Sequence, residues 1–247
     1  EEITAEAAAI RPTVSAVVPA EEDLARAVRA LDGCEDVTIL AGAGCAGAHD
    51  ELLQIAEMLK APIVHAMRGK EWVEHDNPYD VGMTGLLGFS SGYRAMMAAE
   101  TLLVLGSDLP YQQFYPDATV IQVDIRGDRI GRRTPVEVPL VGGVGETIRA
   151  LLPRLRTHTG RKHLDGATKH YAKTRRTLDD LATPSKRTIH PQYLTRLIDE
   201  AADDDAVFLP DVGSPVIWAA RYLTMNGRRR IVGSFTHGSM AVSYTHL

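Results

Sequence analysis

VTILAGAGCAGAHDELLQIAEML, residues 37–59, is the stretch that decides the fold of this chain. Residues 37–41 form a short apolar run rich in β-branched side chains, which is typical of a buried parallel strand. A glycine-containing turn, Gly42–Gly47, follows it. Apolar residues then recur at the spacing of one helical face: Leu52, Ile55, Ala56 and Leu59. The order of strand, glycine turn and helix predicts an α/β unit of the doubly wound type.

The glycine turn has the spacing G-x-G-x-x-G and leaves backbone N–H groups at the start of a helix, where a phosphate can bind. A dinucleotide site of this kind also needs an acidic residue at the end of the next strand, about twenty positions on. That strand, Pro62–Ala66, runs into Met67-Arg68-Gly69 with no carboxylate. A tight turn with close helix–sheet packing explains the glycines at least as well, and an ordinary NAD dehydrogenase is disfavoured.

A second glycine and acid pair gives a better nucleotide signal. The predicted strand Thr101–Leu105 ends in Gly106-Ser107-Asp108-Leu109-Pro110, and the predicted strand Thr119–Val123 ends at Asp124. The two ends are 18 positions apart, from Gly106 to Asp124, which suits a glycine turn and a ribose-binding carboxylate on neighbouring strands. Asp is also common as a helix N-cap or turn residue. Spacing alone supports both interpretations of Asp124 equally.

The remaining elements follow from periodicity and turn residues. Helices are predicted at about 21–31, 91–98, 146–155, 164–181, 190–201 and 214–223, and further strands at 136–141, 206–209 and 230–232. Residues 69–88 are predicted to form one long glycine-bearing loop. The helix that begins at His190-Pro191 is expected to turn these residues inward: Leu194, Leu197, Ile198 and Ala201.

Composition narrows the class of protein. A chain of 247 residues has room for one or two domains. Its net charge of −5 gives no reason to expect nucleic acid as a partner. Cys34 and Cys45 form no C-x-x-C pair, and the nine histidines form no metal-ligand motif, so a reducing cytoplasm and no protein-built metal site are expected. No signal peptide and no apolar run long enough to span a membrane is evident.

Several long blocks of sequence carry a resemblance to a known family. They are AGAGCAGAHDELL (41–53), APIVHAMRGKEWVEHDNPYDVGMTGLLGFSSG (61–92), VLGSDLPYQQFYP (104–116), IHPQYL (189–194), DVGSPVIWAARYLTMNG (211–227) and GSFTHGSMA (233–241). On these blocks the chain resembles the thiamine-diphosphate (ThDP) enzymes of the pyruvate oxidase type, in particular the FAD-containing pyruvate dehydrogenase (quinone) group. The similarity runs from about Ala20 to Ala241.

The resemblance implies an α/β fold with two parts. A central parallel-sheet, Rossmann-like FAD-binding domain is expected at residues 20–155, after an interdomain linker at 1–19. A connector at 156–188 leads to residues 189–241, the truncated start of a second α/β domain that binds the ThDP pyrophosphate. Residues 242–247 depart from the family pattern and are expected to be a non-native tail.

The resemblance also implies cofactor-binding residues. FAD is expected along two loops and an acid: Met83, Thr84, Gly85 and Leu86; Gly106, Ser107, Asp108, Leu109 and Pro110; and Asp124. ThDP is expected against Gly238, Ser239 and Met240. In the family, the glutamate that activates ThDP and the ligands of Mg²⁺ belong to regions that this sequence does not include. No catalytic residue and no metal ligand is therefore expected within it.

The activity implied for the full-length protein is oxidative decarboxylation of pyruvate to acetate and CO₂, with electrons passed through FAD to a quinone. The implied assembly is a homo-oligomer (a tetramer) in the cytoplasm, in possible peripheral contact with the inner face of the plasma membrane. Three alternatives stay open: a phosphate-dependent oxidase that uses O₂, a carboligase of the acetolactate synthase type, and, for the 247 residues alone, an inactive nucleotide-binding module.

Overall fold

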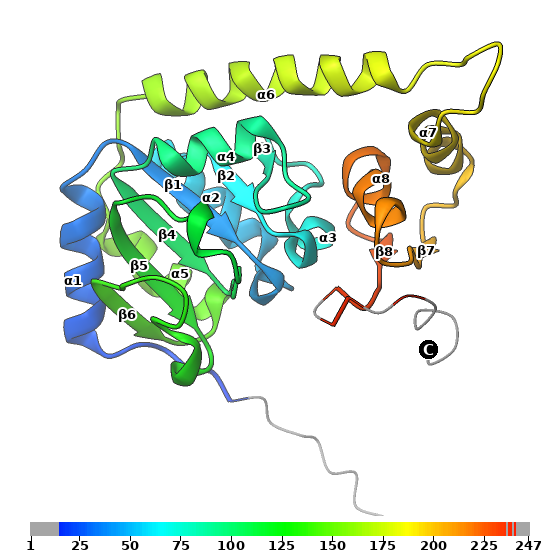
Figure 1. The fold of residues 1–247 in the computed structure, drawn as a ribbon. Helices are drawn as coiled ribbons and strands as arrows, with labels where there is room; N and C mark the ends of the chain where they lie inside the picture. Colours follow the sequence, from blue (N-terminus) through cyan, green and yellow to red (C-terminus); the bar gives the residue numbers. More distant parts are fainter. Residues whose placement is uncertain (1–14, 236, 239, 241–247) are drawn as a thin grey trace, which may run out of the picture.

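A computed structural model describes residues 15–235, 237, 238 and 240 of the chain, and a six-stranded parallel sheet forms its centre (Figure 1). The strands are β1 (Val37–Ala41), β2 (Ile63–His65), β3 (Asp80–Met83), β4 (Thr101–Leu105), β5 (Thr119–Asp124) and β6 (Val138–Val141). They lie in the order β3-β2-β1-β4-β5-β6, and every neighbouring pair is parallel. The predicted α/β fold with a Rossmann-like parallel sheet is confirmed.

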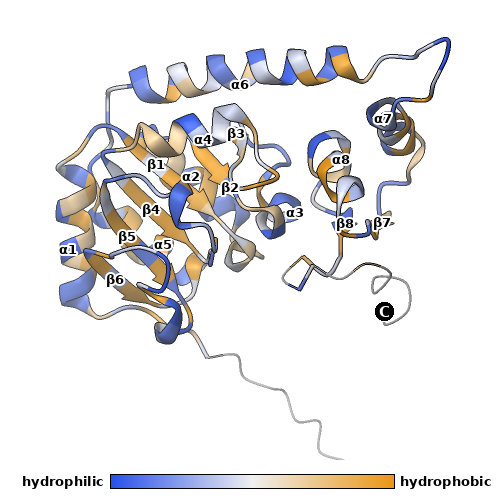
Figure 2. Cartoon of the chain, in the orientation of Figure 1, coloured by the Kyte–Doolittle hydropathy of each residue, from blue (hydrophilic) through white to orange (hydrophobic). Residues whose placement is uncertain are grey.

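Helices cover both faces of this sheet. The helices α1 (Glu21–Asp32), α2 (His49–Leu59) and α5 (Val144–Leu151) bury their apolar side chains against one face. The other face is covered by α4 (Ser90–Met97) and by the long helix α6 (Lys162–Leu181). The strands are apolar along most of their length, whereas α6 mixes polar and apolar residues (Figure 2). Such strands are buried on both sides, which is why they appear in the sequence as continuous apolar runs.

The order of the strands reverses between β1 and β4. From β1 the chain builds outward through β2 and β3, and from β4 it builds in the other direction through β5 and β6. Both neighbours pair with β1 in register, because Ile39 lies opposite Ile63 of β2 and Leu103 of β4. In an open parallel sheet, ligands bind at the carboxyl ends of the strands where the order reverses. The loops after β1 and β4 are therefore the first place to look for a site.

The predicted loop at residues 69–88 is wrong in part. It contains a short helix, α3 (Lys70–Val73), and the edge strand β3. In β3, Gly82 has a φ of +91° and the register of pairing with β2 shifts, so the strand lacks the regular pattern that sequence analysis depends on. Short 3₁₀ turns also lie between the helices and strands of the central sheet region: Ala43–Cys45, Met67–Gly69, Gln112–Phe114, Gly127–Arg129 and Leu152–Arg154.

Beyond α6 the chain forms a second, smaller unit. It contains α7 (Pro191–Ala201), β7 (Val207–Phe208), α8 (Ser214–Tyr222) and β8 (Arg230–Ile231), and the two strands pair in parallel. The prediction that α7 turns its apolar residues inward is wrong for this chain, because three of them are exposed by 41% to 47%: Leu194, Leu197 and Ile198. Periodicity identifies the apolar face of a helix but not what covers it. Among the described residues, no helix is both long enough and apolar enough to cross a membrane.

Candidate functional site

The glycine turn after β1 is closed by packing against the loop after β4. The N–H of Gly42 donates to Leu105 O at 2.9 Å, and the N–H of Gly44 donates to Gly106 O at 3.0 Å. A Cβ on Gly42 would lie 2.3 Å from Gly106 O, and one on Gly44 would lie 2.6 Å from Gly106 Cα. The two loops therefore touch through their backbones. Close packing accounts for Gly42 and Gly44, and the Gly44 N–H group is already used within the protein.

Two buried hydroxyl groups lie in the predicted flavin loops. Thr84 follows β3 and Ser107 follows β4, and each is only 3% exposed. Neither Thr84 Oγ1 nor Ser107 Oγ has a hydrogen-bond partner among the described residues. The loops also approach each other, since a Cβ on Gly85 would lie 3.3 Å from Leu109 Cδ1. Because a buried hydroxyl without a partner is unfavourable, this edge of the sheet has polar groups that a ligand could satisfy.

Asp124 ends β5 at the same edge of the sheet. Its side chain is 8% exposed, and its Oδ1 accepts a hydrogen bond from the backbone N–H of Arg126 at 2.8 Å. This is the turn contact that Asp commonly makes two residues along the chain. This hydrogen bond supports the interpretation of Asp124 as a turn residue. A ligand role for the same carboxylate stays a prediction.

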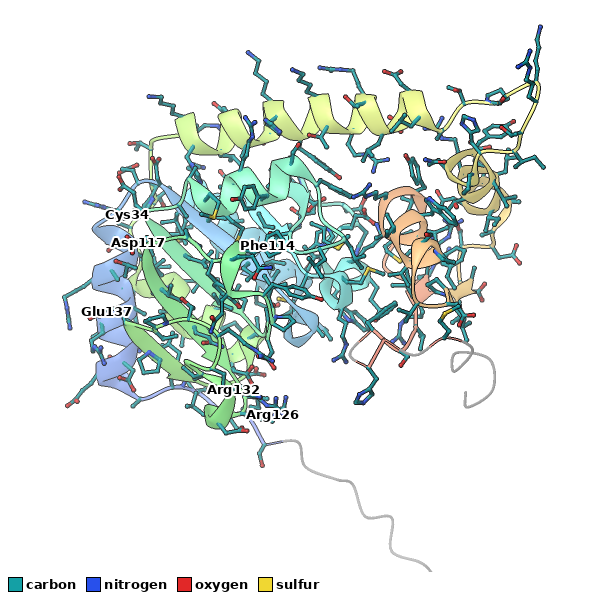
Figure 3. All side chains as sticks on the ribbon, in the orientation of Figure 1. Cys34, Phe114, Asp117, Arg126, Arg132 and Glu137 are labelled. Carbon is teal, nitrogen blue, oxygen red and sulfur yellow. The ribbon has the colours of Figure 1, made fainter. Side chains whose placement is uncertain are left out.

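Arginines in the loop after β5 are the part of this edge that sequence analysis missed. Arg133 donates to both oxygens of Asp108, from Nε at 2.6 Å and from Nη2 at 3.2 Å, and Arg129 Nη1 lies 3.4 Å from Asp108 Oδ2. Burial by itself raises the pKa of Asp108, but these guanidinium groups hold that pKa below its usual value. Arg126 and Arg132 extend from the same loop (Figure 3). The sequence pattern that could have identified this basic loop is the presence of four arginines within residues 126–133, directly after Asp124.

The other predicted cofactor residues divide into three groups. Met83 and Leu109 are buried in apolar clusters. Leu86 and Pro110 are exposed. A Cβ added to Gly238 would have no described atom within 4 Å, and Met240 is 73% exposed. Ser239, residues 1–14 of the linker and residues 242–247 of the tail lie outside the described residues.

Comparison with known protein families assigns the region that contains the six-stranded sheet to a family. Residues 24–151, slightly more than half of the chain, match the thiamine pyrophosphate enzyme central domain. This chain belongs to the thiamine pyrophosphate enzyme family. The matched region contains the whole six-stranded sheet and the helices α2 to α5, with most of α1.

Related proteins extend the match toward the carboxyl end of the chain. A protein of Pseudomonas amyloderamosa, an uncharacterized 42.6 kDa protein from the isoamylase 3′ region, is 54% identical over 74% of this chain and 46% of its own length. YdaP of Bacillus subtilis (strain 168), whose name describes a thiamine pyrophosphate-containing protein, is 32% identical over 87% of this chain and 38% of its own length. An acetolactate synthase of Mycobacterium bovis is 27% identical over 78% of this chain. The chain spans less than half the length of each of these relatives.

A second group of polar residues lies between β2, α3 and β3 of this family member. His65 Nε2 lies 3.6 Å from Asp80 Oδ1, and ligand atoms of His65, Glu74 and Asp80 all lie within 4.8 Å of one another. Lys70 is fully buried, and its Nζ lies 2.5 and 2.6 Å from the two oxygens of Glu74. The lysine ammonium therefore already supplies a positive charge to this group. The group opens on a cavity of about 270 Å³ that Tyr171 also lines.

Asp80→Asn should change how stability depends on pH. Burial raises the pKa of Asp80, against the opposing charge of His65, so the folded protein holds this proton to a higher pH than the unfolded chain does. Asp80 therefore disfavours the folded state increasingly as the pH rises above its ordinary pKa of 3.8. Urea unfolding should show that the free energy of unfolding of Asp80→Asn rises relative to the unmodified chain as the pH is raised from the ordinary pKa of Asp80, 3.8, to its raised pKa in the folded protein, and is constant above that. A difference that stays constant across this range, like that of the surface control Asp128→Asn, would contradict the prediction.

Proposed function

We propose that this chain is the FAD-binding central part, with the start of a ThDP-binding part, of an enzyme that decarboxylates pyruvate oxidatively and passes the electrons to a quinone. The observation that carries the FAD assignment is the pair of buried, unpartnered hydroxyls, Thr84 Oγ1 and Ser107 Oγ, at the carboxyl edge of the sheet. The choice of pyruvate and quinone is supported by the sequence blocks at 61–92, 104–116 and 211–227.

The residues of this edge fit a flavin dinucleotide. Thr84 and Ser107 would donate hydrogen bonds to it, and Asp124 would accept one from its ribose hydroxyls. Arg129 and its neighbours in the loop after β5 would place positive charge beside its pyrophosphate, where guanidinium groups pair well with oxyanions. When bound, FAD supplies a two-electron acceptor.

The chain itself would bind and orient the cofactor and exclude water around it. The backbone contacts of Gly42 and Gly44 with Gly106 fix the loop after β4 in place. The core packing of Met83 and Leu109 fixes the ends of the two flavin loops. A rigid support of this kind keeps a cofactor in one geometry, which is the main contribution that a protein makes to cofactor chemistry.

A carboligase that joins two 2-keto acids is a second candidate function. Relatives named as acetolactate synthases, from Mycobacterium bovis and Zea mays, align with 78% and 90% of this chain. The two functions differ in the product that is released and in whether electrons leave the enzyme.

One experiment separates these candidates. The full-length protein, supplied with ThDP, Mg²⁺, FAD and pyruvate, should bleach the flavin absorbance without oxygen and release acetate, and a soluble quinone should restore the absorbance. Formation of acetolactate without any external acceptor would replace the proposal with the carboligase. If neither product forms and the flavin stays oxidised, pyruvate is not the substrate.

Asp124→Ala should weaken binding of FAD by the full-length protein. A hydrogen bond to a charged group contributes about 1.5–3 kcal/mol, so the dissociation constant should rise about 10- to 100-fold. Asp124→Asn keeps an oxygen for the N–H of Arg126 but removes the charge. The exposed Asp117→Ala, in the segment before β5, serves as control. Flavin fluorescence titration measures the affinity. Unchanged affinity together with a lower melting temperature in Asp124→Ala would leave Asp124 as a turn residue only.

A further inference from the structure

A second cavity, of about 310 Å³, lies between α4 and α6. Asp36, which precedes β1, forms part of its wall, so the cavity lies near the amino ends of the strands. The predicted flavin loops follow the carboxyl ends, at the opposite edge of the sheet. Small residues of both helices, including Ala95 of α4 and Ala167 of α6, leave the space open. This cavity is therefore separate from the flavin edge.

Hydrogen bonds between elements hold the walls of this cavity. Ser90 Oγ lies 3.1 Å from His170 Nε2, which joins the start of α4 to the middle of α6. Thr38 Oγ1 of β1 lies 2.8 Å from His163 Nε2 near the start of α6. His163 and His170 both line the cavity, so both ring positions are set by contacts to the sheet or to α4. The cavity is a feature of the packed fold, not a gap between loose surface side chains.

Three hydrogen-bond donors that line the cavity have no partner among the residues that the structure describes. Ser91 is 1% exposed, and its Oγ makes no hydrogen bond with the described residues. In the described part of the chain, the Arg94 guanidinium and the Lys162 ammonium also form no ion pair, although many other basic groups of the protein do. Asp36 is the acidic side chain among the lining residues, so one negative charge stands against two positive charges. Burial is the main cause that lowers the pKa of His170, and the charges of Arg94 and Lys173 lower it further. At His163, which also lines the cavity, burial lowers the pKa while the carboxylates of Asp36 and Glu100 oppose that shift, so the positive charge is concentrated near Arg94.

We propose that this cavity binds the oxyanion group, a phosphate or a carboxylate, of a small metabolite. Arg94 and Lys162 would supply the positive charge, and Ser91 would donate a hydrogen bond from the buried side of the cavity. Charge-assisted hydrogen bonds of this kind are stronger than neutral ones, and a buried hydroxyl that lacks a protein partner gains most from a ligand. The small residues of the floor leave room for the rest of a compact molecule.

Titration of the 247-residue chain with inorganic phosphate, at constant ionic strength, tests this proposal. Two-dimensional NMR should show saturable shifts of the amides of Gly92, Ala95 and Gly166, which lie in or next to the cavity wall. The double variant Arg94→Gln/Lys162→Gln should weaken binding by about tenfold or more. The matched control Lys169→Gln/Arg176→Gln removes the same charge from α6 outside the cavity and should leave the affinity unchanged. Equal losses in both double variants would show diffuse attraction to a basic surface and would overturn the proposal.

Ser91→Ala separates a ligand role from a structural role. Because Ser91 Oγ has no partner within the described part of the chain, its removal should leave the melting temperature unchanged or slightly higher while it weakens phosphate binding several-fold. A lower melting temperature with unchanged affinity would contradict its role in binding. Titration with acetate under the same conditions identifies the source of the oxyanion: binding of acetate supports a carboxylate ligand, and binding of phosphate alone supports a phosphate ester. Failure of both anions to produce saturable shifts would overturn the proposal.

Discussion

Gly42→Ala should destabilise the protein by about 3–4 kcal/mol, a large part of the stability of a typical domain. A Cβ at this position would lie 2.3 Å from Gly106 O, 2.6 Å from Ser107 Cα and 2.7 Å from Ser107 Cβ. Two of these atoms belong to the backbone of the loop after β4, which is held by a hydrogen bond from Gly106 N to Val123 O at 2.9 Å. Neither loop can move without breaking contacts at the centre of the sheet. Urea unfolding of the 247-residue chain measures the loss.

Gly47→Ala provides the matched control from the same turn. Gly47 has a φ of +74° and nothing within 4 Å of its added Cβ, so only the backbone strain remains. That strain costs about 1–2 kcal/mol. If the turn served phosphate binding and not packing, Gly42→Ala would fold normally and lose only its affinity for the flavin. A free energy of unfolding within error of that of Gly47→Ala would therefore contradict the packing interpretation.

The central sheet was predictable because its strands and helices show regular patterns. The apolar runs at β1, β4 and β5 are buried on both sides, and α2 buries the four residues that its periodicity identified. The edge strand β3 was not predictable in the same way. It contains only four residues, with Gly82 at a positive φ and Asp80 in a buried position. Neither residue is typical of a strand, and only the pairing with β2 makes this segment one.

The strand ends that carry the candidate site could be predicted from the sequence, but the contacts around them could not, and the cofactor roles of these residues stay predictions. The spacing from Gly106 to Asp124 identified two strand ends that do lie on neighbouring strands. Sequence could not show that Asp108 is paired with Arg133, or that Thr84 and Ser107 are left without partners. Such facts depend on side-chain directions and on contacts between loops. The family match fixed which fold to expect, and the contacts then separated packing residues from residues available to a ligand.

The short helix α3 was missed for a different reason. Its sequence, Lys70-Glu71-Trp72-Val73, contains two charged residues that would suit an exposed loop, yet both are buried. The buried positive charge of Lys70 is paired with the carboxylate of Glu74, four residues further along the chain. The buried carboxylate of Glu71 accepts hydrogen bonds from residues of β8, which lie about 160 positions away in the sequence. Local sequence analysis cannot detect a partner at that distance.

Glu71→Ala should release β8 from α3, whereas the apolar cluster that contains Met83, Leu178 and Tyr222 still joins the second unit to the central part. Glu71 Oε2 accepts hydrogen bonds from Arg230 Nε at 2.8 Å and from the backbone N–H of Ile231 at 3.1 Å, and Arg230 also lies over the ring of Trp72 at 4.9 Å. The hydrogen bond from Arg230 to Glu71, together with the charge of Glu71, raises the pKa of Arg230. Hydrogen bonds to a charged group contribute about 1.5–3 kcal/mol, and Arg230 is half exposed, so the loss should be about 2–3 kcal/mol.

Amide hydrogen exchange at Ile231 and in β7 measures this release, because those amides should exchange about 30- to 150-fold faster in Glu71→Ala while amides of β1 and β4 keep their protection. Glu71→Gln keeps an acceptor for the N–H of Ile231 and should restore part of the protection. Glu146→Ala, which removes a surface ion pair with Arg149, is the control and should change nothing at β8. The segment that follows β8 contains the predicted ThDP residues Gly238 and Met240, so the same variant should lower the ThDP affinity of the full-length protein. If exchange rises equally in β1 and β8, Glu71 stabilises the whole fold and does not specifically hold β8 to α3.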